Sequence, residues 1–229
     1  MRPTVFLFDI DGTLITTGGS GRRAMERGFG AVHGRPEAMR FPMDGMTDRL
    51  IVRQALAAIA VEATDAEIDR VLAAYVAVLH EEVASVPDDR YRVHAGMREA
   101  IESAIARGAA VGLGTGNVRA GAQVKLDRVG LGQTFRFGGF GCDAESRVDL
   151  IRIGAERGAA ELGLPVGACR VVVIGDTPKD VAAAHGIGAE CVAVGTGNYA
   201  PEALLASGAR AAFRDLSAPG ALDALFTGG

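Results

Sequence analysis

The sequence predicts an α/β protein with a parallel sheet and an all-helical segment inserted after the first strand. Two observations predict this fold class. Short apolar runs that end in Gly, Asp or Thr alternate with helical stretches, as in βαβ units. Between the first and second of these runs, residues 17–88 contain no convincing buried strand. The first pattern predicts the sheet, and the second predicts a separate helical part.

The strands are predicted from continuous apolar runs, which are typical of parallel strands buried on both faces. Val5-Phe6-Leu7-Phe8 and Val171-Val172-Val173-Ile174 are the clearest of these runs. The five expected strands span residues 5–8, 110–113, 135–137, 171–174 and 191–194. Helices are expected at residues 94–107, 118–129, 149–162 and 178–185.

The inserted segment has the pattern of a helical subdomain. Thr64 and Glu67 are spaced as in a capping box, and apolar residues follow at helical spacing up to residue 83. Residues 20–32 and 48–60 predict two further helices. We therefore expect residues 1–16 and 89–229 to form an α/β core, with residues 17–88 as a helical cap.

Composition excludes several classes of protein. The chain has 229 residues, of which 48% are hydrophobic and 23% charged, as expected of a globular protein. The net charge of −4 offers no basic surface for nucleic acid. No apolar run approaches the length of a membrane span, and the N-terminus lacks the pattern of a secretion signal. These features predict a cytoplasmic protein with no membrane or nucleic-acid partner, and they do not predict an oligomeric state.

Polar residues follow three of the predicted strands. Parallel strands bind ligands at their carboxyl edge, so these residues are candidates for one site. Two carboxylates as close as Asp9 and Asp11 repel each other unless a cation lies between them, and Mg²⁺ is the natural cation. A hydroxyl and free N–H groups at a helix start suit an anion. The candidates are Asp9 and Asp11, then Thr115, Gly116 and Asn117, then Asp176 and Asp180.

Each of these signals also has a structural explanation. The Asp9–Asp11 pair is compatible with a simple turn that ends the strand. Asn117 is also suited to capping the next helix. Asp180 is placed as the third residue of a helix whose cap is Thr177, an ordinary helix start.

Taken together, the three sites resemble the haloacid dehalogenase superfamily. The segment DIDGTL resembles its first motif, GTGN its second and VVVIGDTPKD its fourth, and the helical insert lies where that superfamily places a type 1 cap. The resemblance covers essentially the whole chain. It implies a Rossmann-like parallel sheet and, for most members, phosphatase activity that requires Mg²⁺.

The third motif departs from the family pattern. The family places a lysine or arginine shortly before the fourth motif, often in a Lys-Pro-x-Pro stretch, whereas this chain has AESRVDLIRIG there. Arg147 is our choice for this role and Arg152 is the alternative. Either is also compatible with an ordinary surface arginine.

The resemblance implies a role for each matched residue. Asp9 would be the nucleophile that forms an aspartyl-phosphate, and Asp11 would protonate the leaving group and then activate water. Thr115, Gly116, Asn117 and Arg147 would hold the phosphoryl group. Asp9, the backbone carbonyl of Asp11, and Asp176 would bind Mg²⁺, with Asp180 behind them to orient the metal site.

Substrate choice is expected to depend on the cap. The segment MDGMTDRLI resembles the cap loop of phosphoglycolate-phosphatase-like members, so Thr47 and Arg49 are candidate substrate contacts. Alternatively, Thr47 caps the next helix and Arg49 faces solvent. We expect a phosphatase for a small, phosphoglycolate-like monoester. The alternatives are a sugar-phosphate mutase of the same superfamily or a catalytically idle binding module.

The other reactions of the superfamily fit less well. Dehalogenases lack the second acid of the first motif, and Asp11 is present here. Phosphonatases use a lysine of the cap, and residues 17–88 contain none.

Overall fold

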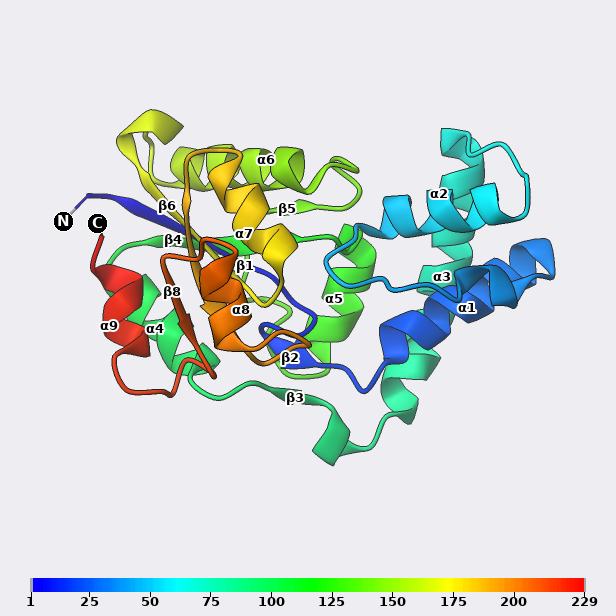
Figure 1. Cartoon of the computed structure of the whole chain (residues 1–229), viewed down its shortest axis with the longest axis horizontal. Coiled ribbons are helices and arrows are strands. Elements are labelled where there is room, and N and C mark those ends of the chain that lie inside the picture. Colours follow the sequence, from blue (N-terminus) through cyan, green and yellow to red (C-terminus); the bar gives the residue numbers. More distant parts are fainter. Residues whose placement is uncertain (1, 229) are drawn as a thin grey trace.

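A computed structural model describes residues 2–228 and contains a six-stranded parallel sheet (Figure 1). The strand order is β5-β4-β1-β6-β7-β8, so the chain reverses its direction of travel across the sheet beside the central strand β1. Such a switch point opens a crevice at the carboxyl edge. The strands are β1 (Thr4–Phe8), β4 (Ala110–Thr115), β5 (Gly138–Phe140), β6 (Arg170–Gly175), β7 (Glu190–Val194) and β8 (Ala211–Phe213). The predicted α/β fold class is confirmed.

Helices cover both faces of the sheet, because successive side chains of a strand point to opposite sides. Phe6 and Phe8 pack on one face, while Val5 and Leu7 pack on the other. The first face is covered by α4 (Met97–Ala106), α5 (Arg119–Asp127) and α9 (Ala221–Phe226). The second is covered by α6 (Arg147–Glu161), α7 (Pro178–His185) and α8 (Pro201–Ala206), with η3 (Val166–Ala168) before β6.

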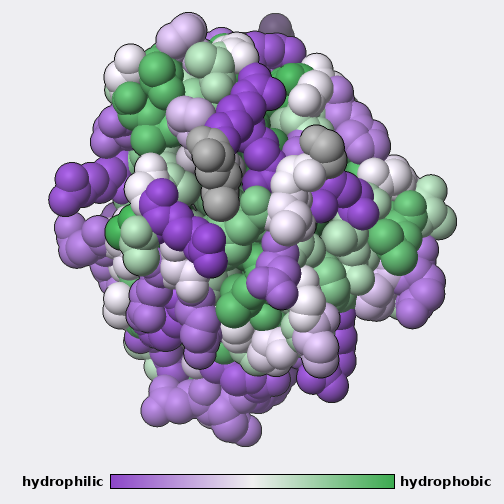
Figure 2. Space-filling view, turned by 90° about the vertical axis from the view of Figure 1, so that its left-hand side faces the viewer, coloured by the Kyte–Doolittle hydropathy of each residue, from purple (hydrophilic) through white to green (hydrophobic). Residues whose placement is uncertain are grey.

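The inserted segment is helical, as expected. It contains α1 (Ser20–His33), η1 (Pro36–Met39), α2 (Asp48–Ala58), α3 (Asp65–Ser85) and η2 (Asp88–Arg90). Helices α1 and α3 pack so closely that a Cβ atom at Gly28 would lie 2.6 Å from the backbone nitrogen of Tyr75. These helices lie at one end of the molecule and the chain termini at the other (Figure 1). Figure 2 shows the end with the termini, where hydrophilic and hydrophobic residues are mixed over the surface.

The two chain segments that connect the helical insert to the sheet pair with each other. They are β2 (Ile15–Thr16) and β3 (Arg92–Val93), which run antiparallel. The entry and exit of the insert therefore lie side by side. This pairing supports our proposal of a cap near residues 17–88, although the exact boundaries stay a prediction.

The third strand differs from the expectation. It was expected at residues 135–137, whereas β5 spans Gly138–Phe140. A Cβ atom at Gly139 would lie 1.7 Å from the carbonyl oxygen of Leu150 in α6, so only glycine fits there. Glycine is usually unfavourable in strands, and the close approach of α6 explains its presence here.

Among residues 2–228, no helix is both long enough and apolar enough to cross a membrane.

Candidate functional site

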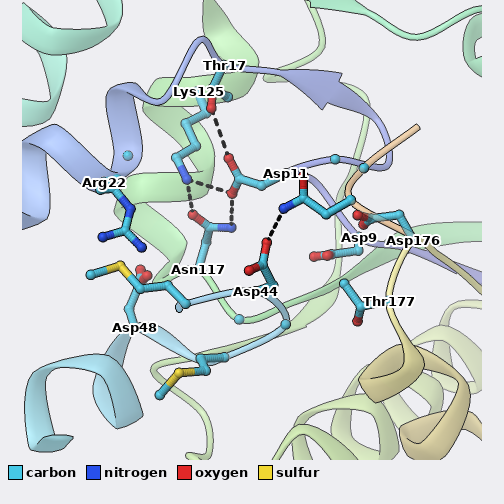
Figure 3. A pocket seen from close by; sticks show the side chains of 18 of the residues that line it. Asp9, Asp11, Thr17, Arg22, Asp44, Asp48, Asn117, Lys125, Asp176 and Thr177 are labelled. Atoms are coloured by element: carbon cyan, nitrogen blue, oxygen red, sulfur yellow. Dashed lines mark hydrogen bonds and ion pairs between the residues drawn. The ribbon is translucent and has the colours of Figure 1, made fainter. Parts of the chain in front are cut away.

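A cavity of about 500 Å³ lies between the carboxyl edge of the sheet and the helical insert. Asp9, Asp11, Gly116, Asn117, Arg147 and Asp176 line its sheet side. Arg22, Asp44, Asp48 and Tyr75 are among the residues that line it from the insert. Figure 3 shows that Asp9 and Asp176 lie together on one side, while Asp11 points toward Lys125 on the other.

Asp9 follows β1 directly and is buried beside a cation. Its Oδ2 lies 2.9 Å from Nη2 of Arg147, and both side chains are 8% exposed. Burial raises the pKa of Asp9 to about 6, and the attraction of Arg147 limits that rise. The structure thus brings Arg147 to the carboxylate, while Arg152 pairs with Asp149 and does not line the cavity.

Asp176 follows β6 and is held tightly. The Thr13 hydroxyl donates to its Oδ1 at 2.7 Å. Cβ atoms at Gly12 and Gly197 would lie 2.4 Å and 1.8 Å from its Oδ2, so both loops must carry glycine to pack around this carboxylate. Burial and the neighbouring carboxylates of Asp180 and Asp9 raise the pKa of Asp176 well above its ordinary value.

The carboxylates of Asp9, Asp176 and Asp180 offer oxygen atoms that all lie within 4.8 Å of one another. Hard oxygen donors at this spacing suit Mg²⁺, which usually takes one or two protein carboxylates and keeps other positions for water or substrate. The like charges that raise the pKa of Asp176 are the kind a divalent cation would compensate. The residues present therefore fit a magnesium ion.

Asp180 has all its contacts within the protein. Its Oδ1 accepts from Nε of Arg147 at 2.8 Å, and its Oδ2 accepts from the backbone nitrogen and the hydroxyl of Thr177 at 3.0 and 2.7 Å. It completes a capping box at the start of α7 and is fully buried. The capping interpretation of Asp180 is confirmed, and the residue also holds Arg147 in place, while its role in orienting a metal site stays a prediction.

Asp11 faces away from the other acids. Its Oδ2 accepts from Nζ of Lys125 at 2.6 Å and from Nδ2 of Asn117 at 2.8 Å, and its Oδ1 accepts from the Thr17 hydroxyl at 3.3 Å. Burial alone would raise its pKa, but Lys125 and these hydrogen bonds lower the pKa of Asp11 below its ordinary value. Lys125 was not among the candidates from the sequence.

The three candidate residues at the end of β4 differ in whether they reach the cavity. Gly116 and Asn117 line the cavity, whereas Thr115 is fully buried and does not. The Thr115 hydroxyl accepts from Nδ2 of Asn117 at 2.9 Å and so fixes that amide. In this structure Thr115 supports Asn117 and does not face the cavity.

The two candidate contacts from the insert lie outside the cavity. The Thr47 hydroxyl caps α2 by accepting from Leu50 and donates to the carbonyl oxygen of Glu145. The Arg49 guanidinium lies 2.6 Å from both Asp65 and Asp69 of α3. We therefore do not retain either residue as a substrate contact.

Asp48 and Arg22 take the place of those residues in the cavity. Asp48 begins α2, and its Oδ2 accepts from the backbone nitrogen of Val118 at 2.8 Å. The Arg22 guanidinium of α1 donates to the carbonyl oxygens of Met39 and Phe41. Asp48 was not among the candidates from the sequence. Asp48 lies in the same cap segment as Arg49, but the sequence does not show which of these two neighbouring residues faces the cavity.

The model of the haloacid dehalogenase-like hydrolase family matches residues 6–185. Three solved structures have similar folds. CbbY from Rhodobacter sphaeroides, in complex with xylulose-1,5-bisphosphate, has a TM-score of 0.71 and 16% identity over 96% of this chain and 97% of that chain. A hydrolase from Pseudomonas syringae has a TM-score of 0.67 and 19% identity over 99% and 97%. A predicted phosphoglycolate phosphatase from Haemophilus somnus has a TM-score of 0.66 and 18% identity over 98% and 99%. No curated protein sequence matches the chain significantly.

Proposed function

Because the chain belongs to the haloacid dehalogenase-like hydrolase family, we propose that it is a Mg²⁺-dependent phosphatase acting on a small organic phosphate monoester. The observation that carries this proposal is the buried Asp9 carboxylate, paired with Arg147 at 2.9 Å and close to the carboxylate of Asp176. A phosphoryl group is negatively charged, and this charge must be offset before an anionic nucleophile can attack it. A carboxylate nucleophile beside a fixed positive charge, as Asp9 is beside Arg147, therefore suits this reaction.

The reaction proposed for these residues has two steps. A carboxylate oxygen of Asp9 attacks phosphorus, and the bond between phosphorus and the leaving oxygen breaks while Asp11 gives that oxygen a proton. A water molecule then attacks the phosphorus of the aspartyl-phosphate, Asp11 takes its proton, and phosphate leaves from a regenerated Asp9. The dianionic substrate favours the protonated form of Asp11 in the first step, because like charges raise a carboxyl pKa.

Asp9, Asp176 and the backbone carbonyl of Asp11 are the groups that would hold Mg²⁺. When bound, the ion offsets the negative charge of the phosphoryl group. Arg147 adds a second positive charge, and Asp180 holds its guanidinium toward Asp9. The N–H groups near Gly116 and Asn117 would bind the remaining phosphoryl oxygens.

The substrate is proposed to be a small phosphorylated metabolite. Two of the proteins with similar folds are described with such molecules, xylulose-1,5-bisphosphate and phosphoglycolate. The case for a carboxylated substrate rested on Arg49, which lies outside the cavity. Arg22 is a cation of the insert that lines the cavity, and it would face the part of the substrate beyond the phosphate. A cytoplasmic location stays a prediction.

The proposal is tested by a screen of small phosphate monoesters with release of inorganic phosphate as the readout. We expect activity with Mg²⁺, loss with EDTA, and recovery when Mg²⁺ is restored in excess. Asp9→Asn should abolish turnover, and Asp89→Asn, which removes an exposed carboxylate outside the cavity, should not. Isomerisation of a sugar phosphate without phosphate release would instead indicate a mutase, and no turnover of any substrate would indicate a binding module.

A further inference from the structure

Lys125 is a buried lysine whose ammonium group reaches the candidate active site. Its side chain is 4% exposed, and it lies in the last turn of α5. Nζ donates to Oδ2 of Asp11 and to Oδ1 of Asn117, each at 2.6 Å. Asn117 in turn donates from Nδ2 to the same Oδ2 of Asp11 at 2.8 Å. The three side chains therefore form a closed triangle of hydrogen bonds (Figure 3).

This triangle holds one oxygen of Asp11 more tightly than the other. Oδ2 receives two short hydrogen bonds, one of them charge-assisted, and such bonds are the strong ones. Among the described residues, Oδ1 receives only the Thr17 hydroxyl, at 3.3 Å. Asp11 lines the cavity, and Oδ1, the less constrained of its two oxygens, would be the one that exchanges a proton with a leaving group or a water molecule.

The helical insert makes room for the lysine. A Cβ atom at Gly21 of α1 would lie 2.9 Å from Nζ of Lys125 and 3.3 Å from its Cε. Lys125 comes from the sheet side of the cavity, and its ammonium group lies where a side chain at residue 21 would crowd it. Alanine is preferred to glycine within helices, so the glycine here matches the position of the lysine.

We infer that Lys125 is a positioning residue that fixes the orientation of the Asp11 carboxylate for proton transfer to the leaving group. This inference rests on the proposed phosphatase function. A proton donor that is misplaced by an ångström loses much of its effect, because catalysis depends on the geometry of the reacting atoms. Lys125 has no reacting atom of its own in this scheme and acts through Asp11.

Two other roles for Lys125 agree less well with these contacts. A substrate-binding lysine would direct its N–H groups into the cavity, but two of them are already given to Asp11 and Asn117. An amine that forms a Schiff base with a carbonyl substrate must have a free lone pair. Asp11 and Asn117 both accept hydrogen bonds from Nζ, so their contacts favour the protonated ammonium, which has no lone pair.

The test uses two variants that reach the same lysine in different ways. Lys125→Met removes the ammonium group and keeps most of the side-chain volume. Gly21→Ala displaces the flexible end of Lys125 from Asp11 and keeps the ammonium group. Gln123→Met is the matched control, since Gln123 is exposed on the same helix and does not line the cavity.

The readout is kcat on two substrates, an alkyl phosphate with a poor leaving group and an aryl phosphate with a good one. Because general acid–base groups contribute about 10²–10⁴-fold, we expect both variants to lower kcat on the alkyl phosphate by about 10–100-fold. On the aryl phosphate we expect a loss below about 3-fold, since that leaving group needs little proton assistance. A crystal structure of Gly21→Ala should show Nζ moved away from Asp11.

A double-variant comparison separates positioning from a general structural effect. If Lys125 acts through Asp11, Lys125→Met together with Asp11→Asn should be no slower on the alkyl phosphate than Asp11→Asn alone, because residues that act as a unit are not additive. If the losses in kcat of the two single variants multiply in the double variant, the inference is overturned. It is also overturned if Lys125→Met impairs both substrates equally and does so through a higher KM. Failure of the wild-type protein to release phosphate would overturn the proposed function itself, and the inference with it.

Discussion

Asp48 offers a sharp test because it is a buried acid with a single strong partner. It begins α2, is 7% exposed, and accepts one hydrogen bond from the backbone nitrogen of Val118 at 2.8 Å. Burial raises the pKa of Asp48 from 3.8 to about 6, against the attraction of Lys125 and this hydrogen bond. The perturbation is Asp48→Asn, which keeps the shape and an oxygen acceptor for Val118 but removes the charge.

The sign of the effect follows from the raised pKa. Below about pH 4 both the folded and the unfolded states carry the proton on Asp48, so the residue contributes no pH dependence. Between about pH 4 and pH 6 the unfolded state loses this proton first, and the free energy of unfolding falls as the pH rises. Above about pH 6 the full cost of the ionised carboxylate is present, and the rise of the Asp48 pKa from 3.8 to about 6 corresponds to about 3 kcal/mol.

Asp48→Asn should therefore stabilise the protein at pH 8 by up to about 3 kcal/mol, which corresponds to about 6–12 °C in melting temperature for a chain of this size. At pH 4 the difference should nearly vanish. Urea unfolding of both proteins between pH 4 and pH 8 measures this, with Asp89→Asn as a control for loss of an exposed carboxylate. A variant less stable than wild type at pH 8 would refute the reasoning, because it would show that the ionised Asp48 stabilises the fold.

The contacts of Asp176, Arg49 and Arg147 lead to three further predictions. Asp176→Asn should raise the Mg²⁺ concentration needed for half-maximal activity more than Asp180→Asn does, and the opposite order in metal titrations would reverse their assigned positions. Arg49→Ala should change KM by less than about twofold and cost at most about 1 kcal/mol per partly exposed ion pair, whereas a large rise in KM would place its guanidinium on the substrate. Arg147→Met should abolish turnover and cost about 3–5 kcal/mol in urea unfolding, because it leaves buried acids without their cation; an unchanged midpoint would contradict this.

The sequence was most informative where local pattern and sheet topology agree. Asp9, Gly116 and Asp176 each follow an apolar run, and the carboxyl ends of parallel strands meet at one edge. Their convergence in one cavity is thus a consequence of the βαβ pattern. Arg147 also reached the cavity, although the expected Lys-Pro-x-Pro stretch is absent.

The sequence was least informative where a side chain's direction depends on how helices pack. Successive residues of a helix point about 100° apart, so the orientation of α2 decides that Asp48 faces the cavity and Arg49 faces α3. Lys125 shows the same difficulty. It lies at helical spacing from the buried Val118 and Ala122, a signal for burial, but its partner Asp11 is more than one hundred residues earlier in the chain.

The most direct test of the proposed mechanism is to trap the phosphorylated enzyme. The protein is mixed with a radiolabelled phosphate monoester and Mg²⁺, quenched in acid, and reduced with borohydride, which converts an aspartyl-phosphate to homoserine. Peptide mass spectrometry then locates the modified residue. We predict homoserine at position 9 in the wild-type protein and none in Asp9→Asn. Phosphate release without modification of Asp9, or modification of a different residue, would contradict the assignment of Asp9 as the nucleophile.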